Sequence, residues 1–243
     1  MTNKPRIEIP KTWAGIDTRE AYRKFVEEGD RTPEPEPSVN ASGKNLDGFV
    51  YNPLTNLYMA KERSHLGLNW NQTHKALNSE GKRMPTIPEF RLYLKYLKEN
   101  ANSNPEFQDI YNEITQVREP WRSEWLDAYF EKRKDGLYVL TGNKSKAEKL
   151  EDCLMKDKTP GINLDDWVSG INTTRQGLPK QKVDDGSLYY WYPRSGGVAW
   201  FNANSDGASL GCLGDPGDTY SSLGVFAAVE NGEARGQKQG GGK

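Results

Sequence analysis

The sequence predicts an α+β fold in which several helices accompany mixed, short, antiparallel strands. The strand pattern is clearest over Gly207–Leu213, where Ala208, Leu210 and Cys212 alternate with the other four residues in the two-residue repeat of a half-buried strand. The helix pattern is clearest at residues 86–89, Thr-Ile-Pro-Glu, which form a capping box with proline in the first turn. Apolar residues follow this box at helical spacing. We therefore expect strands and helices to share one core.

An N-terminal arm, residues 1–47, is expected to precede the compact domain. A short helix is predicted over Thr18–Glu28. A linker is predicted over Arg31–Ser38, because its three prolines remove backbone donors and fix the backbone. The arm is either a docking segment for a partner or subunit, or a loosely attached extension. The compact domain is expected to span residues 48–230, and the Gly-rich tail, residues 231–243, is expected to be disordered.

Cap and turn residues predict where the helices and strands of the domain begin and end. Two short strands joined at Asn52-Pro53 are predicted within Gly48–Ala60. The capped helix should bury the face that runs from Phe90 to Leu97. Further helices are predicted at residues 71–79, 105–117 after an Asn104 cap, 123–130 and 145–155. Strands are predicted at residues 137–140, 198–203 and 223–227, and long loops with a short turn near residues 164–168 are predicted over 157–186.

The segment Leu188–Val229 differs in composition from the rest of the chain. Lys and Glu are dense from Met1 to Lys182, yet neither occurs within this segment, where Gly, Ser, Tyr, Trp, Asn and Asp take their place. Tyr and Trp offer large contact area at low rotamer cost, and Ser, Gly and Asn offer adaptable hydrogen bonds. The segment therefore has the composition of a binding surface.

Bulk properties disfavour several classes of function. A formal net charge of -1 argues against a nucleic-acid binder that works by neutralising phosphates. Two cysteines, Cys153 and Cys212, are too few for a disulfide-built secreted scaffold, and Cys212 has the inward register of its strand. No stretch has the apolar length of a signal peptide or a membrane span, so we expect a soluble protein without membrane insertion.

The run Val198–Cys212, followed by Asp215-Pro216 and Leu223–Ala228, resembles the C-terminal variable region of diversity-generating retroelement variable proteins. In that family a reverse transcriptase copies a template and mutates its adenines, so that codons such as those for Asn become codons for almost any residue. An Asn codon altered in this way cannot reach Lys, Glu, Gln or Met, which are absent from residues 188–229. Trp191 and Trp200 would need another adenine-starting codon, such as one for Arg.

The resemblance implies a fold of the C-type-lectin kind, which formylglycine-generating enzymes share. A second segment agrees with it: Gly81–Phe90 looks like the RLPT-x-x-EW element that opens a helix in formylglycine-generating-enzyme-like domains. Within this resemblance Arg83, Pro85, Thr86 and Glu89 are structural residues.

The family pattern also implies which positions vary and form the ligand-binding surface. These positions are Trp191, Pro193, Ser195, Trp200, Gly207, Ser209, Gly211, Leu213, Gly214, Gly217, Thr219, Tyr220, Ser221, Ser222 and Phe226. The expected aromatic anchors are Trp191, Trp200, Tyr220 and Phe226. Core packing is the alternative for them, above all for Trp200, which adjoins Phe201. The expected fixed scaffold is Leu210, Cys212, Leu223, Gly224 and Val225.

Two other functions are alternatives to this one. A calcium-dependent carbohydrate-binding lectin could use the oxygen ligands of Asn202, Asn204, Asp206, Asp215 and Asp218, but the Glu-Pro-Asn, Gln-Pro-Asp and Trp-Asn-Asp motifs of such lectins are missing. Asp and Asn are also ordinary turn residues.

A formylglycine-generating-enzyme-like oxidase would carry two reactive cysteines in the C-terminal part of the domain, where only Cys212 lies. His65 and His74 suit neither a metal pair nor a catalytic triad, and local hydrogen bonding is the favoured interpretation.

We expect a binding protein rather than an enzyme, without catalytic residues, metal or cofactor. Its expected ligand is a protein or glycan on a cell surface, in viral or phage tropism or in adhesion. The protein itself is expected on a virion or a cell surface, as a homo-oligomer or a virion component.

Overall fold

The computed structural model describes residues 12–13, 16–17 and 46–232. The predicted helix at Thr18–Glu28, the linker at Arg31–Ser38 and residues 233–243 of the predicted tail lie outside the described residues. Within the arm, β1 (Thr12–Trp13) pairs antiparallel with β2 (Ile16–Asp17). Among the described residues, no helix has both the length and the apolar character that a membrane span requires.

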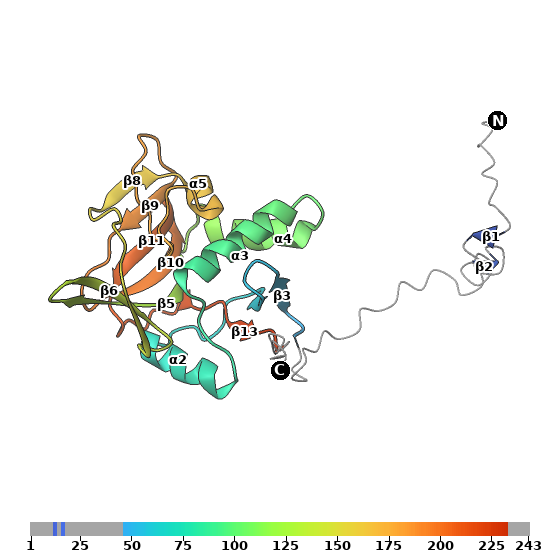
Figure 1. Ribbon diagram of the computed structural model, residues 1–243, viewed down its shortest axis with the longest axis horizontal. Helices are drawn as coiled ribbons and strands as arrows, with labels where there is room; N and C mark the ends of the chain where they lie inside the picture. Colours follow the sequence, from blue (N-terminus) through green and yellow to red (C-terminus); the bar gives the residue numbers. More distant parts are fainter. Residues whose placement is uncertain (1–11, 14–15, 18–45, 233–243) are drawn as a thin grey trace, which may run out of the picture.

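The domain is of the α+β class, with two largely antiparallel sheets and four described helices (Figure 1). The larger sheet has eight strands in the order β7-β6-β5-β10-β11-β9-β8, and β12 pairs with β5. Its strands are β5 (Arg122–Arg133), β6 (Gly136–Thr141), β7 (Lys146–Lys149), β8 (Lys158–Ile162), β9 (Leu188–Trp191), β10 (Val198–Asn204), β11 (Gly207–Gly214) and β12 (Leu223–Gly224). The β11–β9 and β12–β5 pairs are parallel.

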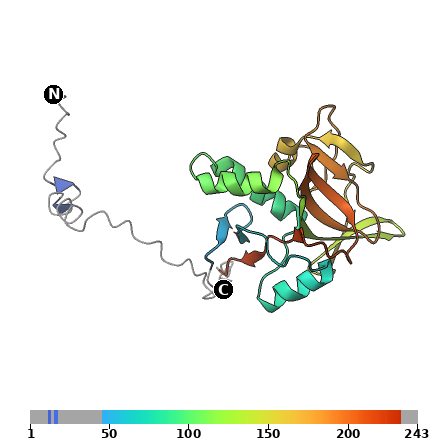
Figure 2. The ribbon, with the colours of Figure 1, turned by 180° about the vertical axis from the view of Figure 1, so that it is seen from behind.

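The smaller sheet joins the first and last strands of the domain. Its order is β13-β4-β3, and its strands are β3 (Phe49–Asn52), β4 (Leu57–Ala60) and β13 (Ala228–Glu230). The helices are α2 (Trp70–Ser79), α3 (Ile87–Asn100), α4 (Pro105–Thr115) and α5 (Leu164–Ser169). Figures 1 and 2 show α3, α4 and α5 together on one side of the large sheet, with α2 apart from them.

The caps explain where the helices begin. Thr86 accepts a hydrogen bond from the N–H of Glu89, whose side chain accepts one from the N–H of Thr86, so the predicted capping box is present. Arg83 donates two hydrogen bonds to the same carboxylate, at 2.7 and 2.8 Å. Asn104 caps α4 as predicted, and α2 begins one residue before its predicted start.

Two hydrophobic clusters stabilise the domain. The larger one packs one face of the large sheet, including Phe201, Leu210 and Cys212, against Phe90 and its neighbours on α3. The smaller one lies around Trp70, Leu77, Trp125, Val198 and Leu223. These five residues come from α2, β5, β10 and β12, so α2 contacts β5 from outside the main core.

Two predicted helices are wrong. Residues 123–130 belong to β5, and residues 145–155 form β7 and an irregular segment. β5 is central and almost wholly buried: Trp125 lies in one cluster and Leu126, Ala128 and Phe130 lie in the other. Apolar residues on both faces erase the period-two pattern that marks a half-buried strand.

The C-terminal strand prediction needs a smaller correction. β12 ends at Gly224, and the chain then passes from the large sheet to the small one through bridges of Val225 with Ser64 and of Ala228 with Arg83. β8 lies in the segment predicted as loops, while α5 occupies the predicted short turn. The other predicted strands and turns are present.

Candidate functional site

Neighbouring strands bring aromatic residues into one row across the large sheet. Trp200 of β10 pairs with Trp125 of β5 and with Gly211 of β11, which pairs with Trp191 of β9. Residues paired across strands point to the same side of a sheet. This side is opposite to the one that packs on α3, because the alternate residue Phe201 lies in the main core.

A second row on the same side is polar. Asn202 pairs with Ser123 on β5 and with Ser209 on β11, and Ser209 pairs with Tyr189 on β9. Along β10, Trp200, Asn202 and Asn204 are half-buried, whereas the residues between them are buried. We call Tyr189, Trp191, Trp200, Asn202 and Asn204 the sheet face. None of these five side chains is charged.

Trp200 lies over two glycines of the neighbouring strand. A Cβ on Gly211 would be 2.1 Å from Nε1 of Trp200, and a Cβ on Gly214 would be 3.0 Å from Cε3 of the same ring. The ring also stacks on Trp125, with centroids 5.7 Å apart and an interplanar angle of 30°. Gly207, Ser209 and Gly211 are buried and Leu213 is half-buried. The expectation that the residues alternating with the apolar positions of β11 face solvent is therefore wrong at the first three of these residues.

The loop Asp215–Ser222, called here the 215–222 loop, adds an exposed aromatic residue. Tyr220 is 52% exposed and contacts Trp121 edge-on, with ring centroids 5.6 Å apart. Trp121 is itself 37% exposed. Asp215 shapes the loop by accepting a hydrogen bond from the N–H of Gly217 at 2.8 Å.

A buried charge network ties this loop to β5. Nη1 of Arg63 donates to the carbonyl oxygens of Ser222 and Ser123. Next to it, Nη2 of Arg122 lies 3.1 Å from Oε2 of Glu124. Burial raises the pKa of Glu124, and the positive charges of Arg122 and Arg63 oppose that rise. The end of the 215–222 loop is thus held by partly buried hydrogen bonds from Arg63.

Phe226 is not a surface anchor. It is 1% exposed, and its ring centroid lies 6.2 Å from those of both Phe90 and Tyr93 on α3. The guanidinium of Arg122 lies 5.4 Å from the centroid of the same ring. The expectation that Phe226 faces a ligand is therefore wrong, because its ring is packed in the main core.

The predicted variable positions fall into three groups by exposure. The exposed ones are Ser195, Gly217, Thr219, Tyr220 and Ser221. The half-buried ones are Trp191, Trp200, Leu213 and Ser222. The buried ones are Pro193, Gly207, Ser209, Gly211, Gly214 and Phe226. Of the accessible positions, Trp191 and Trp200 lie on the outer side of β9 and β10, Ser195 lies between these two strands, and Leu213 lies on β11. The other five lie in the 215–222 loop.

Sequence reasoning missed Trp121 and Tyr189. Trp121 precedes β5, far from residues 188–229 in the chain, so no local pattern connects it with Tyr220. Tyr189 lies within that segment, and the alternation of Leu188, Tyr189, Tyr190 and Trp191 between buried and half-buried could have identified it as outward-facing.

Two of the residues considered for calcium, Asn204 and Asp215, use a side-chain oxygen in a turn. Oδ1 of Asn204 accepts hydrogen bonds from the N–H groups of Asp206 and Gly207, at 2.9 and 3.2 Å. Among the described residues, no group of three or more His, Cys, Asp or Glu side chains is placed to hold a metal ion. Asn204 and Asp215 thus use these oxygens as acceptors of backbone N–H groups, which is the turn role open to them.

The two histidines contact neighbouring side chains, and the strand cysteine, Cys212, is buried. His65 bonds to Ser64 and Glu80, and Nε2 of buried His74 lies 3.3 Å from Oδ1 of buried Asp127. Cys212 is fully buried, and burial raises the pKa of its thiol. Its inward register is confirmed, and the raised pKa disfavours the thiolate form.

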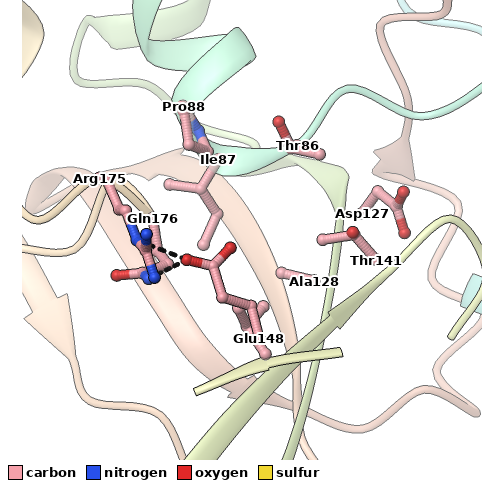
Figure 3. A pocket seen from close by; sticks show the side chains of 10 residues that line it. Thr86, Ile87, Pro88, Asp127, Ala128, Thr141, Glu148, Arg175 and Gln176 are labelled. Atoms are coloured by element: carbon pink, nitrogen blue, oxygen red, sulfur yellow. Dashed lines mark hydrogen bonds and ion pairs between the residues drawn. The ribbon is translucent and has the colours of Figure 1, made fainter. Parts of the chain in front are cut away.

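A pocket of about 160 Å³ lies at the start of α3 (Figure 3). Its polar side chains include Asp127, Glu148, Arg175 and Gln176. Oε1 of Glu148 lies 2.6 Å from Nε of Arg175 and accepts a 2.6 Å hydrogen bond from Gln176. Oδ2 of Asp127 accepts a 2.6 Å hydrogen bond from the N–H of Gly142. Both carboxylates thus connect strands and loops of the domain.

The accessible outer face is therefore the strongest candidate site: it combines exposed Trp121 and Tyr220 with half-buried Trp191 and Trp200, whereas the small pocket has its carboxylates bound to the protein. No protein-family model, curated protein or solved structure matches the chain.

Proposed function

We propose that the protein is a hypervariable ligand-binding protein, namely a diversity-generating retroelement variable protein with a C-type-lectin-type fold. It would present the sheet face and the 215–222 loop to a protein or glycan on a cell surface. The observation that carries the proposal is the division of β9 and β10 into two kinds of position. Inward residues such as Phe201 and Tyr190 are sealed in the core, whereas outward Trp191 and Trp200 remain accessible. Such a frame tolerates changes on one side only.

The chemistry of the surface suits recognition. Exposed Trp and Tyr side chains contribute most to binding when they fill a partner's pockets, and amide groups beside them adapt their hydrogen bonds. Here Trp191 and Tyr220 supply aromatic contact area, and half-buried Asn202 supplies an amide. The absence of charge from the sheet face favours a neutral protein or glycan surface.

Trp121 extends this surface beyond the variable segment. Because it contacts Tyr220, a ligand that covers Tyr220 would also meet Trp121. We expect Trp121 to be a constant part of the site that each new set of variable residues keeps.

A library experiment tests the proposal without knowledge of the ligand. One displayed library randomises four accessible positions, Trp191, Thr219, Tyr220 and Ser221. The control library randomises four buried positions, Phe201, Leu210, Cys212 and Leu223. Most members of the first library should stay folded, as judged by protease resistance on the display particle, and selection against hen lysozyme should yield binders. Members of the control library should mostly unfold.

Equal losses of folded members in the two libraries would overturn the proposed binding surface. The retroelement origin has its own test, which is to sequence the DNA beside the gene. We expect a near-copy of the codons for Leu188–Val229 that differs only at adenines, next to a reverse transcriptase gene. A neighbourhood without such a copy would contradict the retroelement origin, while the library result would still decide the binding surface.

A further inference from the structure

Four lysines from two segments of the chain surround one open hollow. The N–H of Leu154 donates to the carbonyl of Pro179 at 2.7 Å, and this bond places residues 154–158 beside residues 179–182. The N–H of Val183 donates to the carbonyl of Gly161 at 2.7 Å, which keeps the second segment against β8. The resulting hollow measures about 630 Å³ and is lined by Lys156, Lys158, Lys180 and Lys182, with Leu154 and Met155 beside them.

These lysines have few counter-charges. Nζ of Lys180 lies 3.6 Å from Oε2 of Glu151, a carboxylate that also pairs with Arg175. Within residues 46–232, no ion pair or hydrogen bond of the side chains of Lys156, Lys158 or Lys182 is present.

The acidic residues near these lysines in the chain do not neutralise them. Asp157 is bound to Arg194 and to the N–H of Tyr192. Asp184 and Asp185 do not line the hollow. Like charges so close together repel one another, and an anionic ligand would remove that repulsion.

We propose that this hollow binds a compact ligand that carries two or more phosphate or sulfate ester groups. Lysine is a point-charge ligand for phosphate, and each phosphate carries about -1.5 to -2 charges near neutral pH. About two such groups therefore balance the three unpaired lysines and Lys180. The volume falls within the range of about 300–1,000 Å³ that is typical of small-ligand sites. Leu154 and Met155 offer apolar contact to the scaffold that carries the anions.

The lining favours a compact anion over a nucleic-acid strand. Single strands are bound by aromatic side chains that stack on the bases, and no aromatic residue lines the hollow in the described part of the chain. A long duplex would extend past the lysines over a protein whose formal net charge is -1.

Calorimetric titration tests the proposal with two probes, inositol hexakisphosphate and sucrose octasulfate, with sucrose as the neutral reference. Binding of at least one anionic probe is expected, weaker at about 300 mM than at about 50 mM salt because salt screens the charges. The probe that binds more tightly identifies phosphate or sulfate as the preferred group. Substitution of three exposed lysines, Lys156→Gln, Lys180→Gln and Lys182→Gln, should weaken that binding by about tenfold or more.

The control is a triple variant with the same change in net charge elsewhere: Lys75→Gln, Lys132→Gln and Lys134→Gln. All three of these lysines are exposed, and none lines the hollow. The control should bind the probe as the unmodified protein does, and both variants should keep its melting temperature. An equal loss in the two variants would overturn the proposal in favour of general charge attraction, and no binding of either anionic probe at low salt would also overturn it.

Discussion

Trp200 occupies the space that a side chain on Gly211 would need. A Cβ at position 211 would lie 2.1 Å from Nε1 of the indole, far inside van der Waals contact. The two residues pair across β10 and β11, and both belong to the predicted variable positions. Any side chain at position 211 must therefore move Trp200, so these two positions cannot change independently.

Gly211→Ala should force the indole off β11 and weaken its stacking on Trp125. Overpacking of this kind costs about 1–3 kcal/mol of unfolding free energy, which denaturant titration can measure. The matched control is Gly217→Ala in the exposed 215–222 loop, where a Cβ would be 3.2 Å from the nearest atom, on a side chain. In a Trp200→Ala background, Gly211→Ala should cost less than about 0.5 kcal/mol. An equal cost in both backgrounds would show that the indole is not the obstacle.

Tyr220 and Phe226 form a second matched pair, because both are aromatic and both were predicted to vary. Tyr220→Ala removes a side chain that is 52% exposed, so the change in unfolding free energy should stay within about 0.5 kcal/mol. Phe226→Ala removes a ring packed on Phe90 and Tyr93, and should cost about 3–5 kcal/mol. Chemical denaturation of the two variants compares them directly. Similar costs would mean that the 215–222 loop contributes to the core.

Calcium should leave the stability unchanged. Even weak extracellular calcium sites have dissociation constants of about 10⁻³ M, so about 10 mM Ca²⁺ would stabilise a protein with such a site by at least about 1.4 kcal/mol. Asn204 and Asp215 use their side-chain oxygens as acceptors of backbone N–H groups instead. Thermal unfolding in calcium and in EDTA should therefore coincide. A rise in melting temperature that appears with Ca²⁺ but not with Mg²⁺ would contradict this expectation.

The elements that the sequence predicts correctly are those whose pattern is local. α3 has its cap, its first-turn proline and its apolar spacing within a dozen residues, and β11 has its alternation. β5 is different: its neighbours in the sheet, β6, β10 and β12, come later in the chain and bury it on both faces. The burial that turns its residues into a strand is set by tertiary contacts, which no local period reports.

In the candidate site, too, some features follow from the sequence and others only from the fold. Alternation placed Leu210 and Cys212 in the core, where both are buried. The family resemblance placed Trp191 on the outer side, where it is half-buried. Alternation alone cannot report what covers the outward side, and Trp200 covers Gly211 there. The contact of Trp121 with Tyr220 joins residues about a hundred positions apart, so it follows only from the fold.

Glu89 should make the unfolding free energy of the domain depend on pH in the acidic range. Burial raises the pKa of this carboxyl, but the hydrogen bonds and charge of Arg83 and the N–H of Thr86 outweigh burial and bring the pKa below its usual value. A carboxyl with a lowered folded-state pKa contributes stability above its unfolded pKa, and this contribution is lost as the pH falls through the folded-state value.

Glu89→Gln keeps an acceptor for the capping box but removes the charge. The variant should be less stable than the unmodified protein at pH 7, and the difference should shrink below about pH 4. Urea titrations from pH 3 to 7 measure both. A difference that stays constant over this range would show that the loss comes from the changed hydrogen bonds and not from the charge.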